Sequence, residues 1–200
     1  MLRTRRELIR SGAAGAVVVA ARSAPPAAAA DPLAGANGDK DLLARLVGVE
    51  QLIVFAYAHL LQAGGLSPGT AGVFRTFQSH ENAHVRLLSQ ALAHRGGTRP
   101  PPPSDVKVAS RQLAKLGAGG SLRDSRGDTV CVRYMIGVET VAEGAYYSEL
   151  AKLSDATLLT QATQIMGTEA QHWTALSGLQ HAGDVFLGVP YPTVTGTFPA

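Results

Sequence analysis

Apolar residues recur at steps of three and four along four long stretches of the chain, a spacing that places side chains on one face of an α-helix. These stretches cover about residues 40–62, 67–94, 129–153 and 154–183. Gly64-Gly65 and Gly96-Gly97 follow the first two stretches, and Pro68 opens the second, as expected for helix ends and helix starts. The pattern predicts an all-α fold of four long helices.

The connections between these helices differ in length. The first and second helices, and the third and fourth, are joined by short turns, whereas residues 95–128 separate the second from the third. This segment opens with prolines at 100–103, which favour an extended chain, and residues 104–116 predict a short amphipathic helix. A long connection between helices 2 and 3 predicts a four-helix bundle with one crossover. We assign the bundle to residues 40–183, preceded by a turn-rich lead-in at 31–39 and followed by a non-helical tail at 184–200.

The first 30 residues have the pattern of an export signal. Residues 4–10 resemble the twin-arginine motif, with Arg5-Arg6 ahead of two apolar residues and a base, and an apolar segment follows at 12–21. That segment is shorter than the ~20 residues of a membrane-spanning helix, and Ala28-Ala29-Ala30 offers a cleavage site. We therefore expect a periplasmic, cell-envelope or secreted protein that meets the membrane only through its signal. An uncleaved anchor and an ordinary basic N-terminus are the alternatives.

Charge narrows the range of partners. The whole chain has a net charge of +3, but residues 1–30 hold five arginines and one glutamate, so the remainder carries −1. A nearly neutral domain lacks the basic field that holds nucleic acid. The single cysteine, Cys131, excludes an internal disulfide, and we expect it to be buried as a small apolar residue.

Two halves of the chain repeat each other. Gly48-Val49-Glu50 and Ala56-Tyr57 recur 89 residues later, as Gly137-Val138-Glu139 and Ala145-Tyr146. A second motif, Glu-x-x-His, begins at Glu81 and recurs 88 residues later at Glu169. The near-constant offset indicates an internal duplication and a bundle with pseudo-two-fold symmetry.

The repeated residues form a candidate metal-binding set. Residues three apart lie on one face of a helix, so each Glu-x-x-His motif can direct a carboxylate and an imidazole toward the same point. Two further helices each add one glutamate, which gives four negative charges for two divalent ions. Carboxylate and imidazole donors suit iron or manganese. The candidate ligands are Glu50, Glu81, His84, Glu139, Glu169 and His172. The alternative is a pair of solvated Glu–His contacts on helix surfaces.

This pattern resembles the ferritin-like superfamily over about residues 40–183. Within it, the paired Glu-x-x-His motifs are similar to those of rubrerythrin, bacterioferritin and the exported, desiccation-related ferritin-like proteins. The resemblance implies that the six candidate ligands bind two irons and that the site reacts with O2 or peroxide, as a ferroxidase- or peroxidase-like oxidoreductase. No Cys-rich module is present, which argues against a rubrerythrin-type electron-transfer chain. A homo-oligomer is compatible with this resemblance.

Two other functions are alternatives to a di-iron oxidoreductase. The same donors accept manganese, so a catalase-like site that disproportionates peroxide is one alternative. The other is a structural or stress-protection bundle in which the site has no catalytic role.

Several residues near the candidate ligands could also take part in the metal site. Glu143 lies one turn after Glu139 and is a candidate for a seventh ligand, for an acid behind the ligands or for a rim acid. Tyr57 and Tyr146 lie two turns after Glu50 and Glu139, where they could hydrogen-bond ligands, act as redox residues or simply pack in the core. His80 is rotated about 100° from Glu81 on a helix, and we expect it not to be a ligand.

Overall fold

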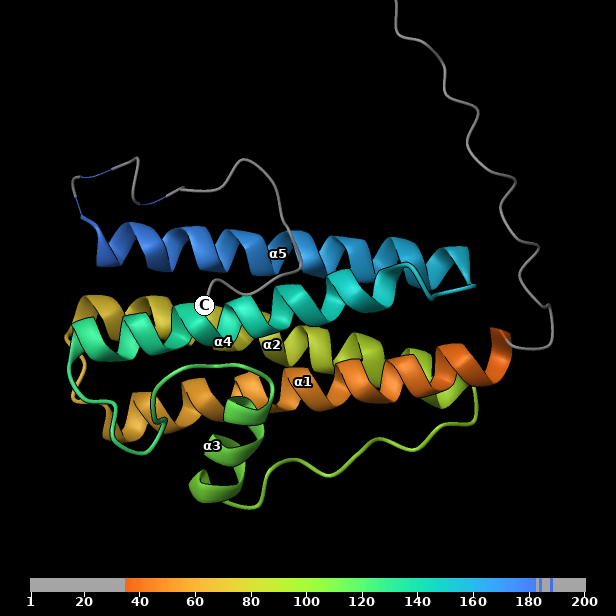
Figure 1. The fold of residues 1–200 in the computed structure, drawn as a ribbon, viewed down its shortest axis with the longest axis horizontal. Coiled ribbons are helices and arrows are strands. Elements are labelled where there is room, and N and C mark those ends of the chain that lie inside the picture. Colours follow the sequence, from red (N-terminus) through yellow and green to blue (C-terminus); the bar gives the residue numbers. More distant parts are fainter. Residues whose placement is uncertain (1–34, 183, 185–187, 189–200) are drawn as a thin grey trace, which may run out of the picture. The chain divides into compact units, whose positions relative to one another are not determined.

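The computed structural model describes residues 35–182, 184 and 188, and these residues form helices without any strand. The chain divides into two compact units, residues 1–30 and 31–200, and every described residue belongs to the second. The five main helices are α1 Gly35–Ala63, α2 Pro68–His94, α3 Val106–Lys115, α4 Asp128–Leu150 and α5 Ala156–Gln180. The four long helices lie alongside one another and the short α3 packs against α1 (Figure 1). The predicted all-α bundle is confirmed.

The directions of the helices follow from two apolar clusters in the core. One cluster contains Leu43 from the start of α1, Leu92 from the end of α2 and Leu158 from the start of α5. The other contains residues from the opposite ends of these helices, among them Leu60 and Phe74. Helices α1 and α5 therefore run one way, and α2 and α4 run the other way.

This arrangement explains the long connection between α2 and α4. Because these two helices run in the same direction, α2 ends at one end of the bundle and α4 begins at the other. The intervening segment crosses the length of the bundle, and its helix α3 buries Ala109 and Leu113 in the core. The predicted crossover between the second and third long helices is present, with α3 close to the range expected for it.

Local sequence signals mark most of the helix ends. Ser67 caps α2, where its hydroxyl accepts a hydrogen bond from the Thr70 backbone N–H, and Pro68 follows at the first helical position. Asp155 caps α5 by accepting from the Thr157 and Leu158 N–H groups. After α2, Gly96 adopts a φ of 69°, a left-handed conformation that favours glycine.

The start of α1 differs from the prediction. The helix begins at Gly35, so residues 35–39 are helical although the sequence predicted a turn-rich lead-in. Asp39, the last residue of this segment, is anchored to the start of α5, because its buried carboxylate accepts hydrogen bonds from Ser154 N at 2.9 Å, Ser154 Oγ at 2.8 Å and Asp155 N at 3.1 Å. This tertiary contact lies near the start of α1, and no local sequence pattern predicts it.

The predicted signal, residues 1–30, lies outside the described residues, as does the start of the lead-in. Of the predicted non-helical tail, the structure describes only Asp184 and Gly188. Gly188 is helical and its N–H donates to the Asp184 carbonyl, so the prediction is wrong at that position.

Replacement of Asp39 by alanine is expected to destabilise the junction between α1 and α5. The substitution leaves partly buried donors at Ser154 and Asp155 without an acceptor, which costs about 1–3 kcal/mol. The free energy of unfolding in urea would measure the loss. Asp41→Ala, two residues further along α1 at an exposed position, is the control and should change stability by less than about 0.5 kcal/mol. Equal stabilities for the two variants would contradict the assignment.

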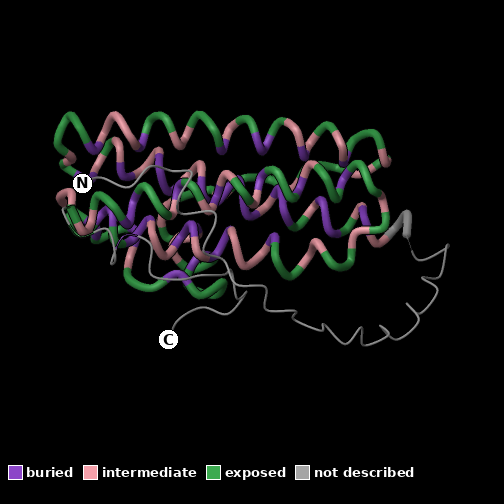
Figure 2. The backbone as a smooth tube through the Cα atoms, turned by 90° about the horizontal axis from the view of Figure 1, so that it is seen from above, coloured by how far each residue is buried: buried purple, intermediate pink, exposed green. Residues whose placement is uncertain are grey.

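Burial follows the inner faces of the long helices (Figure 2). Cys131 lies in this core, as predicted. Among the described residues, one helical segment, Gly38–Ala63, is long and apolar enough to span a membrane, but 56% of its most apolar window is buried in the bundle. Its apolar character is therefore that of a core helix. Between the two apolar clusters, the core contains a layer of buried acids and histidines.

Candidate metal centre

The buried polar layer consists of the six residues that the sequence singled out. Glu50 comes from α1, Glu81 and His84 from α2, Glu139 from α4, and Glu169 and His172 from α5. The four carboxylates have no exposed surface, and the two histidines are 8% and 2% exposed. The three-residue spacing on α2 and α5 turns each Glu–His pair toward the bundle axis, as helix geometry requires.

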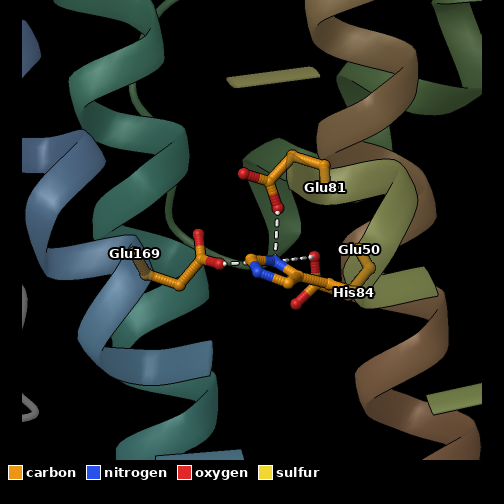
Figure 3. A group of neighbouring side chains, drawn as sticks. All are labelled: Glu50, Glu81, His84 and Glu169. Atoms are coloured by element: carbon orange, nitrogen blue, oxygen red, sulfur yellow. Dashed lines mark hydrogen bonds and ion pairs between the residues drawn. The ribbon is translucent and has the colours of Figure 1, made fainter. Parts of the chain in front are cut away.

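His84 is surrounded by three carboxylates. Its Nδ1 atom lies 3.0 Å from Glu169 Oε1, 3.1 Å from Glu81 Oε2 and 3.5 Å from Glu50 Oε2. Figure 3 shows the imidazole between these carboxylates, which reach it from three different helices. One nitrogen and three oxygens thus converge on one side of the layer.

His172 has the corresponding environment in the other half of the repeat. Its Nδ1 atom lies 2.8 Å from Glu81 Oε1, 3.6 Å from Glu139 Oε1 and 3.9 Å from Glu169 Oε2. Glu81 and Glu169 therefore each direct one carboxylate oxygen toward each histidine. Glu50 lies near His84 only, and Glu139 lies near His172 only.

These residues form two groups that could each hold a metal ion. The first contains Glu50, Glu81, His84 and Glu169, and the second contains Glu81, Glu139, Glu169 and His172; the ligand atoms within a group lie within 4.8 Å of one another. Two carboxylates belong to both groups, as in a pair of neighbouring ions with shared ligands.

Unpartnered atoms support a cation in this position. Six buried carboxylate and imidazole atoms in the layer make no hydrogen bond of good geometry, although some of them lie within ion-pair distance of another residue of the layer. Buried polar atoms without such bonds are costly in a protein interior. The six atoms are Glu50 Oε2, Glu81 Oε1, Glu139 Oε2, Glu169 Oε1, Glu169 Oε2 and His172 Nδ1. All six belong to the two four-residue groups, whose residues therefore fit metal ions; among the described residues, five further buried atoms without a hydrogen bond lie outside the layer.

The pKa values of the buried acids and histidines also indicate that the layer needs positive charge. Burial raises the pKa of Glu50 to about 8, and burial together with repulsion from Glu50 raises the pKa of Glu169 well above its ordinary value. Burial lowers the pKa of His84, but its contacts with Glu169 and the other carboxylates outweigh burial and raise that pKa to about 12. Without metal, bound protons must supply the positive charge that these acids need.

For Glu81 and His172, the balance of burial and contacts differs. Burial raises the pKa of Glu81, but contacts with His172 and His84 outweigh burial and lower it to about 2. The pKa of His172 is lowered by burial and raised more strongly by Glu139 and Glu81, to about 9. The layer therefore holds protonated histidines between carboxylates, and a metal ion would take the place of these protons.

Two buried tyrosines hold the outer carboxylates. The Tyr57 hydroxyl on α1 donates to Glu139 Oε1 on α4, and the Tyr146 hydroxyl on α4 donates to Glu50 Oε1 on α1. Each tyrosine reaches across to the glutamate of the other helix, and the two contacts are related by the repeat. Burial raises the pKa of both hydroxyls well above the ordinary value, and the adjacent carboxylate adds to the rise. Both tyrosines therefore stay protonated and act as donors.

Tyr146→Phe is expected to destabilise the protein because it keeps the ring but leaves Glu50 without its donor. A lost hydrogen bond to a buried carboxyl costs about 1–3 kcal/mol. Unfolding in urea, in the presence of a chelator, would measure this cost. Tyr147→Phe is a matched control, because Tyr147, the next residue along α4, is 48% exposed. If the two variants unfolded at the same urea concentration, the hydrogen bond would contribute nothing.

Glu143 lies outside both groups. It is half-buried on α4, and burial raises its pKa. The structure therefore does not place it among the candidate ligands.

His172 makes two contacts that the sequence does not predict. The exposed His80 places Nδ1 2.9 Å from His172 Nε2, and Phe77 stacks on the His172 ring with centroids 4.1 Å apart. Both come from α2, whereas His172 belongs to α5. The spacing within α2 shows only that Phe77, His80 and Glu81 are neighbours, so no signal in the sequence connects them with a particular residue of α5.

Comparison with known proteins agrees with this geometry. A family model described as a ferritin-like domain matches residues 38–182. Among solved structures, the crystal structure of a conserved hypothetical protein from Mycobacterium tuberculosis is similar, with a TM-score of 0.58 and 17% sequence identity over 82% of this chain and 98% of the other. At that identity the likeness concerns the fold alone. No curated protein matches the sequence.

The family match covers all but the first residues of α1, the other three long helices and all six residues of the buried layer. The predicted superfamily is thereby confirmed: this chain belongs to the ferritin-like domain family.

Proposed function

We propose that this protein binds two iron ions in its buried layer and acts as an oxidoreductase or iron-handling protein. Glu50 and His84 would hold one ion, and Glu139 and His172 would hold the other. Glu81 and Glu169, which belong to both groups, would contribute to both positions. This assignment gives each ion one imidazole and three carboxylate donors, and the four negative charges of the acids balance two divalent cations.

The observation that carries the proposal is the orientation of the two shared carboxylates. Glu81 and Glu169 each direct one oxygen toward His84 and the other toward His172. A single-ion site would not need a carboxylate split in this way. A purely structural polar layer would pair its buried oxygens with well-aligned hydrogen-bond donors, whereas several oxygens here make no hydrogen bond of good geometry.

Iron fits the donor set because oxygen and imidazole ligands bind it readily, and manganese is the alternative on the same ligands. When bound, two ferrous ions supply the two electrons that reduce O2 or peroxide. The protein residues hold the geometry: Tyr57 and Tyr146 fix the outer carboxylates by hydrogen bonds, and apolar clusters on either side exclude water.

The test is oxidation of bound metal. The full chain is loaded anaerobically with two equivalents of Fe2+ and then mixed with O2 or with peroxide, while near-ultraviolet absorbance follows ferric iron. We expect rapid oxidation in the unmodified protein, and only the slow rate of free Fe2+ in Glu81→Ala/Glu169→Ala. Bound iron that oxidises no faster than free iron would refute the oxidoreductase role and favour a structural site.

The manganese alternative has its own readout. The chain loaded with Mn2+ is mixed with peroxide, and evolved O2 is measured with an electrode. Vigorous O2 release from the manganese form, together with slow oxidation of the iron form, would replace the iron proposal by peroxide disproportionation.

We further propose that the protein is exported by the twin-arginine route, on the basis of Arg5-Arg6, the apolar segment at 12–21 and Ala28-Ala29-Ala30. That route carries folded proteins, which suits a site loaded with metal before export. Fractionation of cells that express the chain would test it against Arg5→Lys/Arg6→Lys. Equal retention of both proteins in the cytoplasm would contradict export.

A further inference from the structure

The two halves of the buried layer differ in what lies behind each histidine. Behind His172, His80 Nδ1 is 2.9 Å from Nε2, and the two rings are nearly parallel, with 17° between their planes. Phe77, one turn earlier on α2, stacks on the same imidazole at 21°. The ring of His172 is therefore held by two side chains from another helix.

The repeat places different residues at the corresponding positions in the other half. With the offset of 88 residues, Thr168 corresponds to His80 and Ile165 corresponds to Phe77. The Thr168 hydroxyl donates to the Gln164 carbonyl of its own helix, and Ile165 packs in the apolar cluster. The duplication is thus broken at the two residues that contact His172.

The hydrogen bond determines which nitrogen of His172 is free to bind. Nδ1 faces Glu81, Glu139 and Glu169, and a ring nitrogen that binds a metal must be unprotonated. The remaining proton then sits on Nε2, where it donates to His80 Nδ1. A partner on the outer nitrogen of a metal-binding histidine fixes its tautomer and orientation and increases its donor strength.

We propose that His80 is a positioning residue for His172, and that it makes the metal position at His172 the tighter of the two. This inference rests on the proposed two-metal function. His80 itself does not touch the metal. It acts by accepting the Nε2 proton, so any side chain that places an acceptor at the same point should replace it.

The test is a Co2+ titration of the full chain, followed by visible absorbance. We expect the unmodified protein to bind two Co2+ with unequal affinities. In His80→Ala, the affinity of one of the two ions should fall by about 10- to 100-fold, the usual effect of losing a partner behind a ligand. The other affinity should stay unchanged.

Two further variants separate positioning from other roles. Asparagine can place its side-chain oxygen near the position of a histidine Nδ1, so His80→Asn should restore most of the lost affinity although it cannot titrate. Thr168→Ala is the matched control from the other half of the repeat, and should leave both affinities unchanged.

Two results for His80→Ala would overturn the inference: a titration that superimposes on that of the unmodified protein, or an equal loss of affinity at both metal positions. The inference would also fail if His80→Asn bound Co2+ as weakly as His80→Ala. It would fail as well if Thr168→Ala had an effect equal to that of His80→Ala. A different result marks failure of the underlying function. If the unmodified protein itself binds no Co2+, the two-metal proposal is wrong, and the role of His80 falls with it.

Discussion

The double variant Glu81→Ala/Glu169→Ala is expected to bind no metal, whereas Glu50→Ala should retain one ion of the two. The difference follows from geometry, because Glu81 and Glu169 belong to both four-residue groups and Glu50 belongs to one. Elemental analysis after reconstitution with Fe2+ and removal of free metal would give the number of ions per chain.

The control for this experiment is Glu149→Ala. Glu149 lies on α4 but forms its ion pairs with Arg45 and Lys152, away from the buried layer, and this variant should keep two ions. If the double alanine variant does not fold, Glu81→Gln/Glu169→Gln preserves the side-chain volume and removes the charge, with the same expected loss. Two ions retained by a folded double variant would show that the metals bind elsewhere.

Removal of metal is expected to destabilise the protein by a large amount. A ligand present at 100 times its Kd stabilises the folded state by about 2.7 kcal/mol per site, so two sites contribute about 5 kcal/mol. For a chain of this size each kcal/mol shifts Tm by roughly 2–4 °C, which predicts a fall of roughly 10 °C or more on chelation. Thermal unfolding with metal and with a chelator would measure it. An unchanged Tm would mean that the layer binds no metal under these conditions.

The stability of the metal-free protein should depend on pH in a particular direction. The pKa of Glu50 is raised to about 8 by burial, so its contribution to stability is fully present below its unfolded pKa, about 4.5, and is lost as pH rises through about 8. The raised pKa of His84 acts in the same direction at higher pH, between about 6.5 and about 12. The lowered pKa of Glu81 has the opposite effect, but only below pH 4.5.

The chelated protein should therefore lose stability between pH 5 and pH 9, while the metal-loaded protein should lose less because the metal replaces the protons. Urea unfolding of both forms at pH 5, 7 and 9 would test the sign. A metal-free protein that becomes more stable as pH rises over this range would contradict the assigned protonation of the layer.

Features governed by local geometry could be predicted from the sequence. The apolar spacing, Ser67-Pro68 and the paired glycines placed the helices within a few residues, because these signals act within one or two turns. The three-residue spacing of Glu81–His84 and Glu169–His172 fixed which side chains share a helix face. The repeat then identified Glu50 and Glu139 as the remaining members of the layer.

Features that depend on how helices pack could not be predicted in this way. Tyr57 was placed near the ligands, but its partner is Glu139 on another helix rather than Glu50 on its own. Near the start of α1, Asp39 accepts hydrogen bonds from a residue more than 100 positions away, which no local pattern predicts. The sequence predicts that His80 is not a ligand because it is rotated away from Glu81 on α2, but it does not predict the contact of His80 with His172 on α5.

The most direct test of two metals in one shared site is anomalous X-ray diffraction at the iron edge, from crystals of the full chain reconstituted with Fe2+. We predict two anomalous peaks per chain within the four-helix core, one beside His84 and one beside His172, with Glu81 and Glu169 in contact with both. A single peak, peaks outside this layer, or no peak in a protein saturated with iron would contradict the two-metal site.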